Sequence, residues 1–373
     1  MFEKVKVSAV KSSDYELESL IAAVREAVLK AGGLPEHINS HSKILLKPNL
    51  LTAKSPSESP TVTHPEFIRA VIRVLKEKGI YDITIGDSPA GVHKWEDLWE
   101  KTGIAEVAKS ENVKLIPFEN LKFVYLDSLR IPVLKELDNF DAVISLPKLK
   151  THLLTKTTGS VKNSYGLIIG HAKGHFHTLF PSPMKMSKFI GRLYAAHFKF
   201  DFSIMDAVEC MQGDGPNAGY FYHAGIIFAS SDAVALDSAA SEIFGYLGEN
   251  IPLLKSAEKY GGGVCESSKI ERCGDGWDVV SNSNGKKSKA EILFKFPDRI
   301  FFIVSLITRT RPKVEHSNCT LCRICEKACA QKAIYIKNKK VKLKSSKCIL
   351  CMCCIEACPK QTIKLRTSRL WTS

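Results

Sequence analysis

Between Ala142 and Phe200 the sequence contains no aspartate and no glutamate. These 59 residues include eight lysines, one arginine and five histidines, although the whole chain has 39 acidic residues among 373. A stretch so poor in negative charge favours binding of an anion such as a phosphate, a carboxylate, a nucleotide or nucleic acid. A solvated basic surface that binds nothing is the alternative interpretation.

Signals for membrane insertion or secretion are also missing. The apolar-rich run IFFIVSLI at 300–307 is too short to span a bilayer, so no transmembrane segment is expected. Charged residues interrupt the N-terminal MFEKVKVSAV, which lacks a small-residue cleavage site. We therefore expect a cytoplasmic location, where thiols stay reduced. The twelve cysteines then indicate metal binding or catalysis instead of a disulfide framework.

Nine of the cysteines lie between 319 and 358, and eight of them form two copies of the pattern C-x2-C-x2-C-x3-C. A shift of 29 residues superimposes all four cysteines of one copy on those of the other, which indicates an internal duplication. Each copy ends in a short strand-like segment, AIYI in the first and TIKL in the second. Cys353 is an additional cysteine beside the second run, and a buried spare thiol is its simplest interpretation.

The cysteine spacing predicts two [4Fe–4S] clusters. Three cysteines two residues apart can surround one face of a cubane, and the fourth thiolate must come from elsewhere. In two-cluster ferredoxins the fourth cysteine of each run binds the other cluster. The predicted ligand sets are Cys319, Cys322, Cys325 and Cys358 for one cluster, and Cys348, Cys351, Cys354 and Cys329 for the other. A zinc site would need only four ligands in two C-x2-C pairs and leaves half of the duplicated pattern unexplained.

Residues 313–366 resemble bacterial-type two-[4Fe–4S] ferredoxins, with all eight cysteines at the spacing of that family. Ala330 departs from the family pattern, which usually has proline at this position. Proline tightens the turn there without binding iron, so the departure leaves the prediction of two clusters unchanged.

The first 290 residues alternate strand-like and helix-like segments. The strand-like segments are 5–10, 44–48, 83–87, 142–147, 202–207 and 225–230, and helix-like segments include 15–31, 64–78 and 231–244. Thr63 and Ser231 are candidate N-caps of the helices that follow them. The alternation predicts an α/β fold with a mostly parallel sheet and helices on both faces, followed by a small α+β two-cluster ferredoxin domain.

Polar residues follow five of these strands. In open α/β sheets ligands bind beyond the carboxyl ends of the strands, so these residues predict a binding or catalytic site. Candidates for holding an anionic substrate are Lys47, Asn49, Lys148, Lys150, Lys162 and Asn163. Candidates for proton transfer, or for a Mg²⁺-bound phosphate, are Asp87, His152, Asp206 and Asp214. Helix capping and turn formation are the alternative role for each aspartate and asparagine.

Two glycine-containing loops, TTGSVKNSYGLIIG (157–170) and QGDGPNAG (212–219), would let backbone amides approach a ligand closely. Neither matches a P-loop or a dinucleotide-binding fingerprint. The histidines of GHAKGHFH at 171, 175 and 177 fit a metal, acid–base work on a phosphate, or a solvated loop.

The blocks KPNL, GDSPAG, LPKLKTHLLTKTTGSVKNSYGLIIG and MQGDGPNAG resemble the hallmark blocks of the "domain of unknown function 362" family. The resemblance covers most of residues 1–300, and members of the family often carry a two-cluster ferredoxin module. It implies an iron–sulfur protein but supplies no reaction, so no catalytic role follows from it.

The sequence thus predicts an α/β ligand-binding domain at 1–290, a linker with a docking helix at 291–312, and a ferredoxin domain at 313–373. One hypothesis is an iron–sulfur oxidoreductase that passes electrons to or from a small anionic substrate. The alternative is a ferredoxin-type electron carrier, or a redox-sensing metabolite-binding protein, that serves a redox partner protein without catalysis. Nucleic-acid binding is disfavoured because no nucleic-acid module is recognised.

Overall fold

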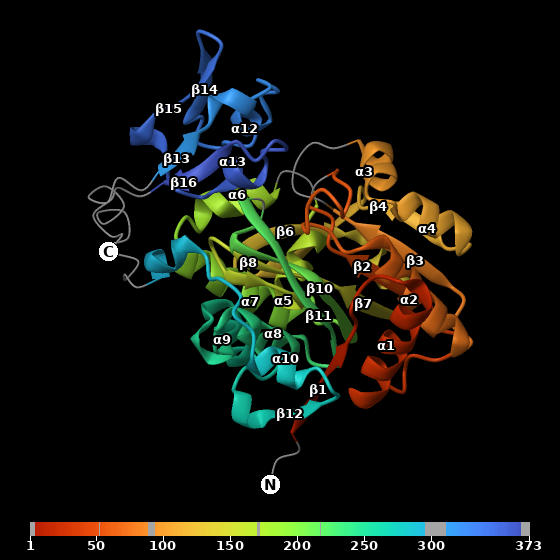
Figure 1. The fold of residues 1–373 in the computed structure, drawn as a ribbon. Coiled ribbons are helices and arrows are strands. Elements are labelled where there is room, and N and C mark those ends of the chain that lie inside the picture. The colour runs from red at the N-terminus through yellow and green to blue at the C-terminus, as the bar shows by residue number, and fades with distance from the viewer. Residues whose placement is uncertain are drawn as a thin grey trace.

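The computed structural model describes residues 4–51, 53–88, 94–169, 172–216, 218–294 and 311–366. A ten-stranded sheet forms the centre of the larger part of the molecule (Figure 1). Across the sheet the strands run β12 (Ile270–Cys273), β1 (Val5–Lys11), β11 (Ala218–Ser230), β10 (Phe202–Asp214), β7 (Ala142–Leu146), β2 (Ile44–Pro48), β3 (Ile83–Asp87) and β4 (Lys114–Pro117). Strands β8 (Lys148–His152) and β9 (Lys156–Thr158) extend the sheet beside β10.

Most neighbours in this sheet are parallel, which confirms the predicted fold class. Strands β10, β7, β2, β3 and β4 pair in parallel, as do β1 with β12 and β10 with β8. Antiparallel pairing among its described strands is confined to β11 with its two neighbours and to β8 with β9. The carboxyl ends of β2, β3 and β7 therefore meet at one edge of the sheet.

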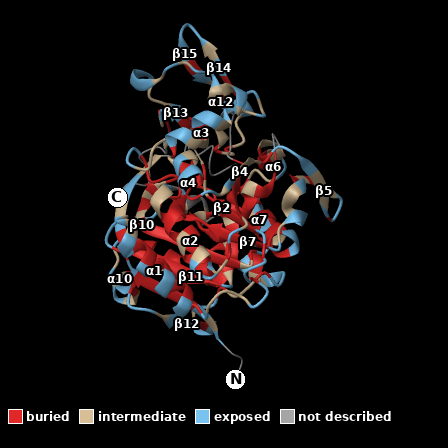
Figure 2. Cartoon of the chain, turned by 90° about the vertical axis from the view of Figure 1, so that its right-hand side faces the viewer, coloured by how far each residue is buried: buried red, intermediate tan, exposed pale blue. Residues whose placement is uncertain are grey.

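Helices cover both faces of the sheet. One face packs against α1 (Leu17–Lys30), α2 (Pro65–Glu77) and α4 (Ile104–Ser110), and the other against α5 (Ser160–Asn163), α7 (Pro183–His197), α8 (Ala233–Ser241) and α9 (Pro252–Lys259). Within β2, Ile44 and Leu46 belong to the first core and Leu45 to the second. Burial on both faces explains why the strands read as continuous apolar runs, and Figure 2 shows this buried interior.

The remaining described elements of this part lie around the sheet. They are α3 (Trp95–Lys101), α6 (Ala172–Leu179), α10 (Trp277–Ser281) and the hairpin of β5 (Leu121–Leu126) with β6 (Leu129–Leu134). The six predicted strands and three predicted helices are all present, but the sequence did not predict β4, β8, β9, β12 or this hairpin.

Two of the predicted N-caps are wrong by one residue. The side chain of His64 accepts a hydrogen bond from the Glu66 amide at the start of α2 (3.2 Å). Thr63 instead donates its hydroxyl to the carbonyl oxygen of Leu146 (2.7 Å). Asp232, not Ser231, caps α8. In both cases the residue nearer the helix has the side chain that reaches the free backbone amides.

The predicted glycine-rich loop 212–219 is largely strand. β10 and β11 are 13 residues each and pair as one long hairpin, whose turn contains the cis bond between Gly215 and Pro216. The turn packs against β8, because Leu153 donates its amide to the Gly215 carbonyl oxygen (3.2 Å).

Residues 311–366 form the smaller part, which repeats itself after 29 residues. Strand β13 (Arg311–Val314) pairs with β16 (Ile363–Arg366), and β14 (Ile334–Lys337) pairs with β15 (Lys340–Leu343). The 29-residue shift places β13 on β15, α12 (Ile324–Lys327) on α13 (Cys353–Glu356), and β14 on β16. It also aligns the left-handed backbones of Leu321 with Leu350 and of Arg323 with Met352.

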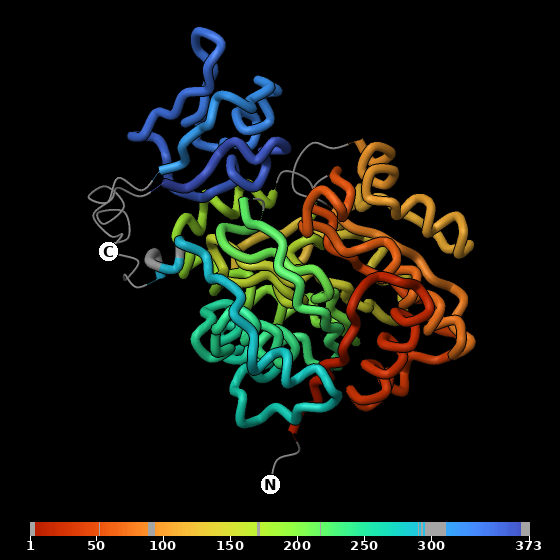
Figure 3. Tube along the Cα trace, in the orientation of Figure 1, coloured from red at the N-terminus to blue at the C-terminus, as the bar shows by residue number. Residues whose placement is uncertain are grey.

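The repeat divides the ferredoxin part into two equivalent ends. We call residues 324–347, which hold α12, β14 and β15, the outer end. We call residues 311–318 and 353–366, which hold β13, α13 and β16, the docked end. α13 lies against the α/β domain, whereas the β14–β15 hairpin projects from the opposite side of the molecule (Figures 1 and 3).

The α/β domain contributes directly to the core of the ferredoxin part. Leu153 and Leu154, in the turn after β8, are 1% and 2% exposed and belong to the same apolar cluster as Met352 and Ile355. The predicted docking helix falls mostly outside the described residues, and 291–294 form the end of a 3₁₀ turn (Lys289–Phe294). Within the described residues, none of the helices has the length and apolarity needed to cross a membrane.

Candidate functional site

The first group at the carboxyl edge of the sheet is centred on Lys47, at the end of β2. Its buried ammonium lies 2.6 Å from Asp87 Oδ1, at the end of β3, and donates to Asn163 Oδ1 on α5 (3.0 Å). Asn163 in turn donates to the backbone carbonyl oxygen of Lys47 (2.9 Å). Burial lowers the pKa of Lys47, and the charge of Asp87 opposes that shift.

Gly166 leaves room for this ion pair. A Cβ atom at residue 166 would lie 2.5 Å from Lys47 Nζ and 2.7 Å from Asp87 Oδ1. The glycine predicted to allow close approach of the backbone therefore brings the chain against a buried lysine–aspartate pair.

A second group is centred on Asp206 in β10. Its carboxylate accepts hydrogen bonds from Lys148 Nζ (2.8 Å), from the Tyr15 hydroxyl (2.8 Å) and from the His64 amide (3.0 Å). The Tyr15 hydroxyl also accepts from Lys148 Nζ (2.7 Å). Lys148 and Asp206 are 2% and 0% exposed, so this triangle is enclosed by protein.

The rings of Tyr15 and His64 stack with their centroids 3.7 Å apart. Burial lowers the pKa of His64 to about 4, with the nearby Lys148 charge acting in the same direction. Burial also raises the pKa of Tyr15 well above its ordinary value. Both side chains are therefore neutral near pH 7.

Lys150 is a buried lysine whose hydrogen-bond acceptors carry no charge. Its ammonium donates to Asn49 Oδ1 and to the Thr61 carbonyl oxygen, both of which are uncharged acceptors. Burial lowers the pKa of Lys150 well below the ordinary value, and the charges of Lys162 and Lys148 lower it further. An anion beside these lysines would restore their preference for the charged form.

Helix α5 carries two of the predicted residues to the same place. Asp237 on α8 accepts hydrogen bonds from the amides of Ser160 and Val161 (2.6 and 2.8 Å), which fixes the first turn of α5. That turn presents Lys162 and Asn163. Burial lowers the pKa of Lys162, while the charge of Glu356 in the ferredoxin part opposes the shift.

Glu356 joins the ferredoxin part to this edge of the sheet. Its Oε1 lies 3.1 Å from His152 Nε2 at the end of β8. His152 Nδ1 accepts from the Leu154 amide (3.0 Å), so Nε2 carries the ring proton that faces the carboxylate. Burial lowers the pKa of His152 to about 4.

Positive groups surround Glu356. Burial by itself would raise its pKa, but the contact with His152 and the charges of Lys162 and His177 bring the pKa down to about 2. Lys173 lies at the same edge of the sheet and donates to the Ser88 carbonyl oxygen. Burial lowers the pKa of Lys173 to about 7.

The groups together form what we call the lysine group. It has five lysines and three carboxylates, namely Lys47, Lys148, Lys150, Lys162, Lys173, Asp87, Asp206 and Glu356. A buried excess of positive charge is costly unless an anion or deprotonation offsets it. The arrangement is therefore chemically suited to a carboxylate or phosphate.

The structure brings most of the predicted site residues into this group but not Asp214. Asp214 Oδ1 accepts from Ser288 Oγ (3.0 Å) and from the Lys289 amide (2.8 Å), and no described contact joins it to the lysines. Sequence reasoning missed Tyr15, His64, Lys173 and Glu356. Only Lys173 had a signal, because it lies in the acid-free segment.

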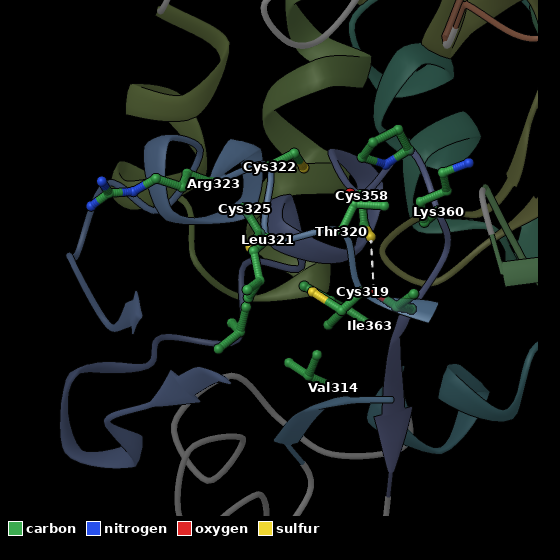
Figure 4. Close-up of a pocket in the computed structure, with 13 residues that line it drawn as sticks. Val314, Cys319, Thr320, Leu321, Cys322, Arg323, Cys325, Cys358, Lys360 and Ile363 are labelled. Carbon is green, nitrogen blue, oxygen red and sulfur yellow. Dashed lines mark hydrogen bonds between the residues drawn. The ribbon is translucent and has the colours of Figure 1, made fainter. Parts of the chain in front are cut away.

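The cysteines of the ferredoxin part line two cavities. Cys319, Cys322, Cys325 and Cys358 line the first, which Figure 4 shows. Cys358 Sγ lies 3.3 Å from Thr362 Oγ1. Cys329, Cys348, Cys351 and Cys354 line the second, together with Cys353. Each cavity therefore receives three cysteines from one run and the fourth from the other.

The cavities suit an iron–sulfur cluster better than a single ion. Within the described residues, no three His, Cys, Asp or Glu side chains are arranged to hold one metal ion. A single zinc requires its thiolates about 2.3 Å from one point. Four thiols spread around a larger apolar cavity fit a cubane. Burial, and then repulsion from neighbouring thiolates, raises the pKa of Cys325 to about 11, so deprotonation there requires a positive partner.

Comparison with known proteins gives two family matches. Residues 44–242 match the model described as "Domain of unknown function (DUF362)", and residues 318–362 match the "4Fe-4S dicluster domain". A thylakoid-associated protein of Synechocystis sp. is 30% identical over 262 residues, which cover 68% of this chain and 79% of that protein. The lactate racemase apoprotein of Thermoanaerobacterium thermosaccharolyticum aligns with a TM-score of 0.40 and 12% identity, over 64% of this chain and 58% of its own.

The first model covers more than half of the chain, and the second supports an iron–sulfur, electron-carrying role for the C-terminal part. The chain therefore belongs to the family described as domain of unknown function 362, and it carries a 4Fe–4S dicluster ferredoxin domain near its C-terminus.

Proposed function

We propose that the protein is an iron–sulfur redox protein in which two [4Fe–4S] clusters exchange electrons with a small anionic substrate bound at the lysine group. One observation carries the proposal: the ferredoxin part closes directly over the lysines, with Glu356 of α13 among them. An electron carrier and an anion site in direct contact suit a reaction that couples the two.

The eight cysteines around the two cavities would hold the clusters. When bound, the clusters supply single electrons at a potential set by their surroundings. The docked end separates them from the lysine group by one short helix, so electrons would travel a short path through protein.

Lys150, Lys162 and Lys173 would hold the anion, because burial has weakened their preference for the charged form and a negative ligand would restore it. The neighbouring side chains are held in place by hydrogen bonds from Lys47 to Asp87 and Asn163. The buried triangle of Tyr15, Lys148 and Asp206 links a hydroxyl, an ammonium and a carboxylate at 2.7–2.8 Å, which suits proton transfer that accompanies electron transfer.

Native mass spectrometry of protein purified without oxygen is the first test. We expect two Fe₄S₄ units per chain, and a retained anion would add further mass. Rapid mixing of dithionite-reduced protein with small carboxylates and phosphate esters would then identify the class that reoxidises the clusters. Uncharged alcohols and amides serve as controls.

A matched pair of variants ties the reaction to the lysine group. Lys150→Met should slow reoxidation by the active anion at least about 30-fold, because a buried charged contact is worth about 2 kcal/mol or more. Lys255→Met, which alters an exposed lysine on α9, should leave the rate unchanged. Equal rates for both variants would show that the anion binds elsewhere.

A second candidate is an electron carrier or redox sensor without turnover. The buried carboxylate of Glu356 favours it, because this side chain supplies the lysine group with an anion from within the chain. Reduced clusters that none of the anions reoxidises would support this candidate, provided that a redox protein still accepts the electrons.

A further inference from the structure

We propose that the outer end of the ferredoxin domain is the docking surface for an acidic electron-transfer protein that exchanges single electrons with the clusters. The proposal rests on the proposed electron-carrying function and adds the kind of partner and where it binds. In each encounter one electron would leave the partner and reduce the cluster, or pass in the opposite direction, and no bond would form or break.

The outer end carries a strong excess of positive charge. Its eight exposed lysines are Lys327, Lys332, Lys337, Lys339, Lys340, Lys342, Lys344 and Lys347. The single carboxylate among residues 324–347 is Glu326, which pairs with Arg323 (2.7 Å). Within the part of the chain that the structure describes, none of the eight lysines belongs to an ion pair. Their charge is therefore available to a partner.

The internal repeat shows that the fold does not require a lysine at several of these positions, although the counterparts of Lys337, Lys340 and Lys342 are also basic. The docked end has the same backbone, yet Glu356 stands where the outer end has Lys327, and Gln361 where it has Lys332. Glu315 is the counterpart of Lys344, and it pairs with Lys364 and Arg366 (3.0 and 3.4 Å). The docked end therefore has five basic residues against two carboxylates, whereas the outer end has eight lysines against one.

Three of the lysines lie on the reverse side of a ribbon that covers a cysteine cavity. Side chains alternate along β14 and β15, so Ile334 and Leu343 face inward and line the second cavity, while Lys337, Lys340 and Lys342 are exposed. Cys329 and Cys348, which line the same cavity, lie just before and just after the hairpin. A partner on the outer face would lie one ribbon thickness from the cysteines.

A protein is the occupant that this surface favours. Tyr335 is 41% exposed between the lysines of the hairpin, and tyrosine is enriched at protein interfaces. The projecting hairpin is also accessible from several sides (Figure 3). A partner with a negative face would be steered to it by long-range attraction.

Two triple variants with the same change in net charge test the surface. Lys337, Lys340 and Lys342 are changed to Gln in the first, and Lys78, Lys101 and Lys109, which are exposed in the α/β domain, are changed to Gln in the second. The holoprotein is reduced with dithionite and mixed rapidly with oxidised flavodoxin, an acidic probe, or with cytochrome c, a basic one.

We expect the hairpin variant to react with flavodoxin about 10-fold more slowly at low ionic strength and to lose most of the salt dependence of that rate. The α/β variant should stay within about twofold of the unaltered protein. Calorimetric titration of the oxidised holoprotein with oxidised flavodoxin, in which no electron passes, should show the same loss of affinity. Reaction with cytochrome c should not slow.

Equal slowing of both variants would show that the rate depends only on net charge, and this result would overturn the proposal. So would an unchanged flavodoxin rate accompanied by loss of binding to phosphatidylserine vesicles, because the surface would then serve a membrane. Failure of dithionite to bleach the protein would contradict the proposed function instead, and the calorimetric titration would still test the docking surface.

Discussion

The two ends of the ferredoxin domain have the same backbone and opposite surroundings. Lys327 ends α12 in solvent, whereas Glu356 ends the equivalent α13 in a buried contact with His152. Apolar residues at equivalent inward positions, such as Ile334 and Ile363, are buried at both ends. The comparison teaches that cysteine spacing, left-handed turns and a few apolar residues specify this fold, and the remaining positions are free to serve either an interface or solvent.

The largest effect is expected when the docked end receives the residue that the outer end has at the equivalent position. Glu356→Lys puts a cation among Lys162, His152 and His177, and we expect it to lower the free energy of unfolding by about 3–5 kcal/mol. Limited proteolysis should then release the ferredoxin domain. The mirror change, Lys327→Glu, should stay within about 0.5 kcal/mol because that site is exposed. Equal effects would contradict the docked arrangement.

Apolar contact at the docked end should have the next largest effect. Leu154→Ala removes a buried side chain from the cluster shared with Ile355 and should cost about 2–4 kcal/mol of stability. Denaturant titration of the anaerobic holoprotein measures the change. Tyr335→Ala at the outer end is the control, and a comparable loss there would mean that the two ends do not differ.

Acid should destabilise the docked end through protonation of His152. The pKa of His152 is about 4 in the folded chain and 6.5 when exposed, so the unfolded state binds more protons between these values. The contribution of neutral His152 to the free energy of unfolding is therefore fully present above pH 6.5. It is lost as the pH falls towards 4, by about 2 kcal/mol down to pH 5.

The variant His152→Gln should flatten that part of the pH dependence, measured by thermal unfolding between pH 7 and 5. Part of the pH dependence of stability would remain in this variant, because the pKa of His64 is lowered in the same way. The exposed His316→Gln should follow the unaltered protein. A similar flattening in both variants would argue against His152 as the source.

The substitution with the smallest expected effect makes the two ends of the ferredoxin domain more alike. Ala330 and Pro359 are equivalent, and both turns are closed by the same bond, from the Lys332 amide to Cys329 (2.9 Å) and from the Gln361 amide to Cys358 (3.1 Å). The backbone at residue 330 should therefore accept proline, and Ala330→Pro should stabilise the holoprotein by about 0.4–1 kcal/mol. A loss of stability in denaturant titration would show that the turns differ.

Local signals in the sequence predicted the six central strands and three helices, because burial on both sheet faces leaves continuous apolar runs. Lys47, Lys148 and Lys150 could be predicted as a group, since the ends of parallel strands meet at one edge. Glu356 could not. Its role depends on how two domains dock, and no local pattern encodes a charge partner more than two hundred residues away.

The missed β5–β6 hairpin has a different cause. Asp127 adopts a left-handed backbone in its turn, φ 53°, and the two strands lie apart from the main sheet with several exposed residues. Apolar and polar residues alternate less clearly along these two strands, so the sequence pattern did not predict them. Tyr15 and His64 were missed because a tyrosine and a histidine beside a helix start are common in any globular protein.

The insertion of Leu153 and Leu154 into the ferredoxin core bears on how the chain is made. Ribosomes synthesise from the N-terminus, and domains tend to fold in that order. The α/β domain would therefore emerge first and offer these two leucines as a platform. The ferredoxin residues, which follow the α/β domain in the chain, would then assemble on a surface that already exists.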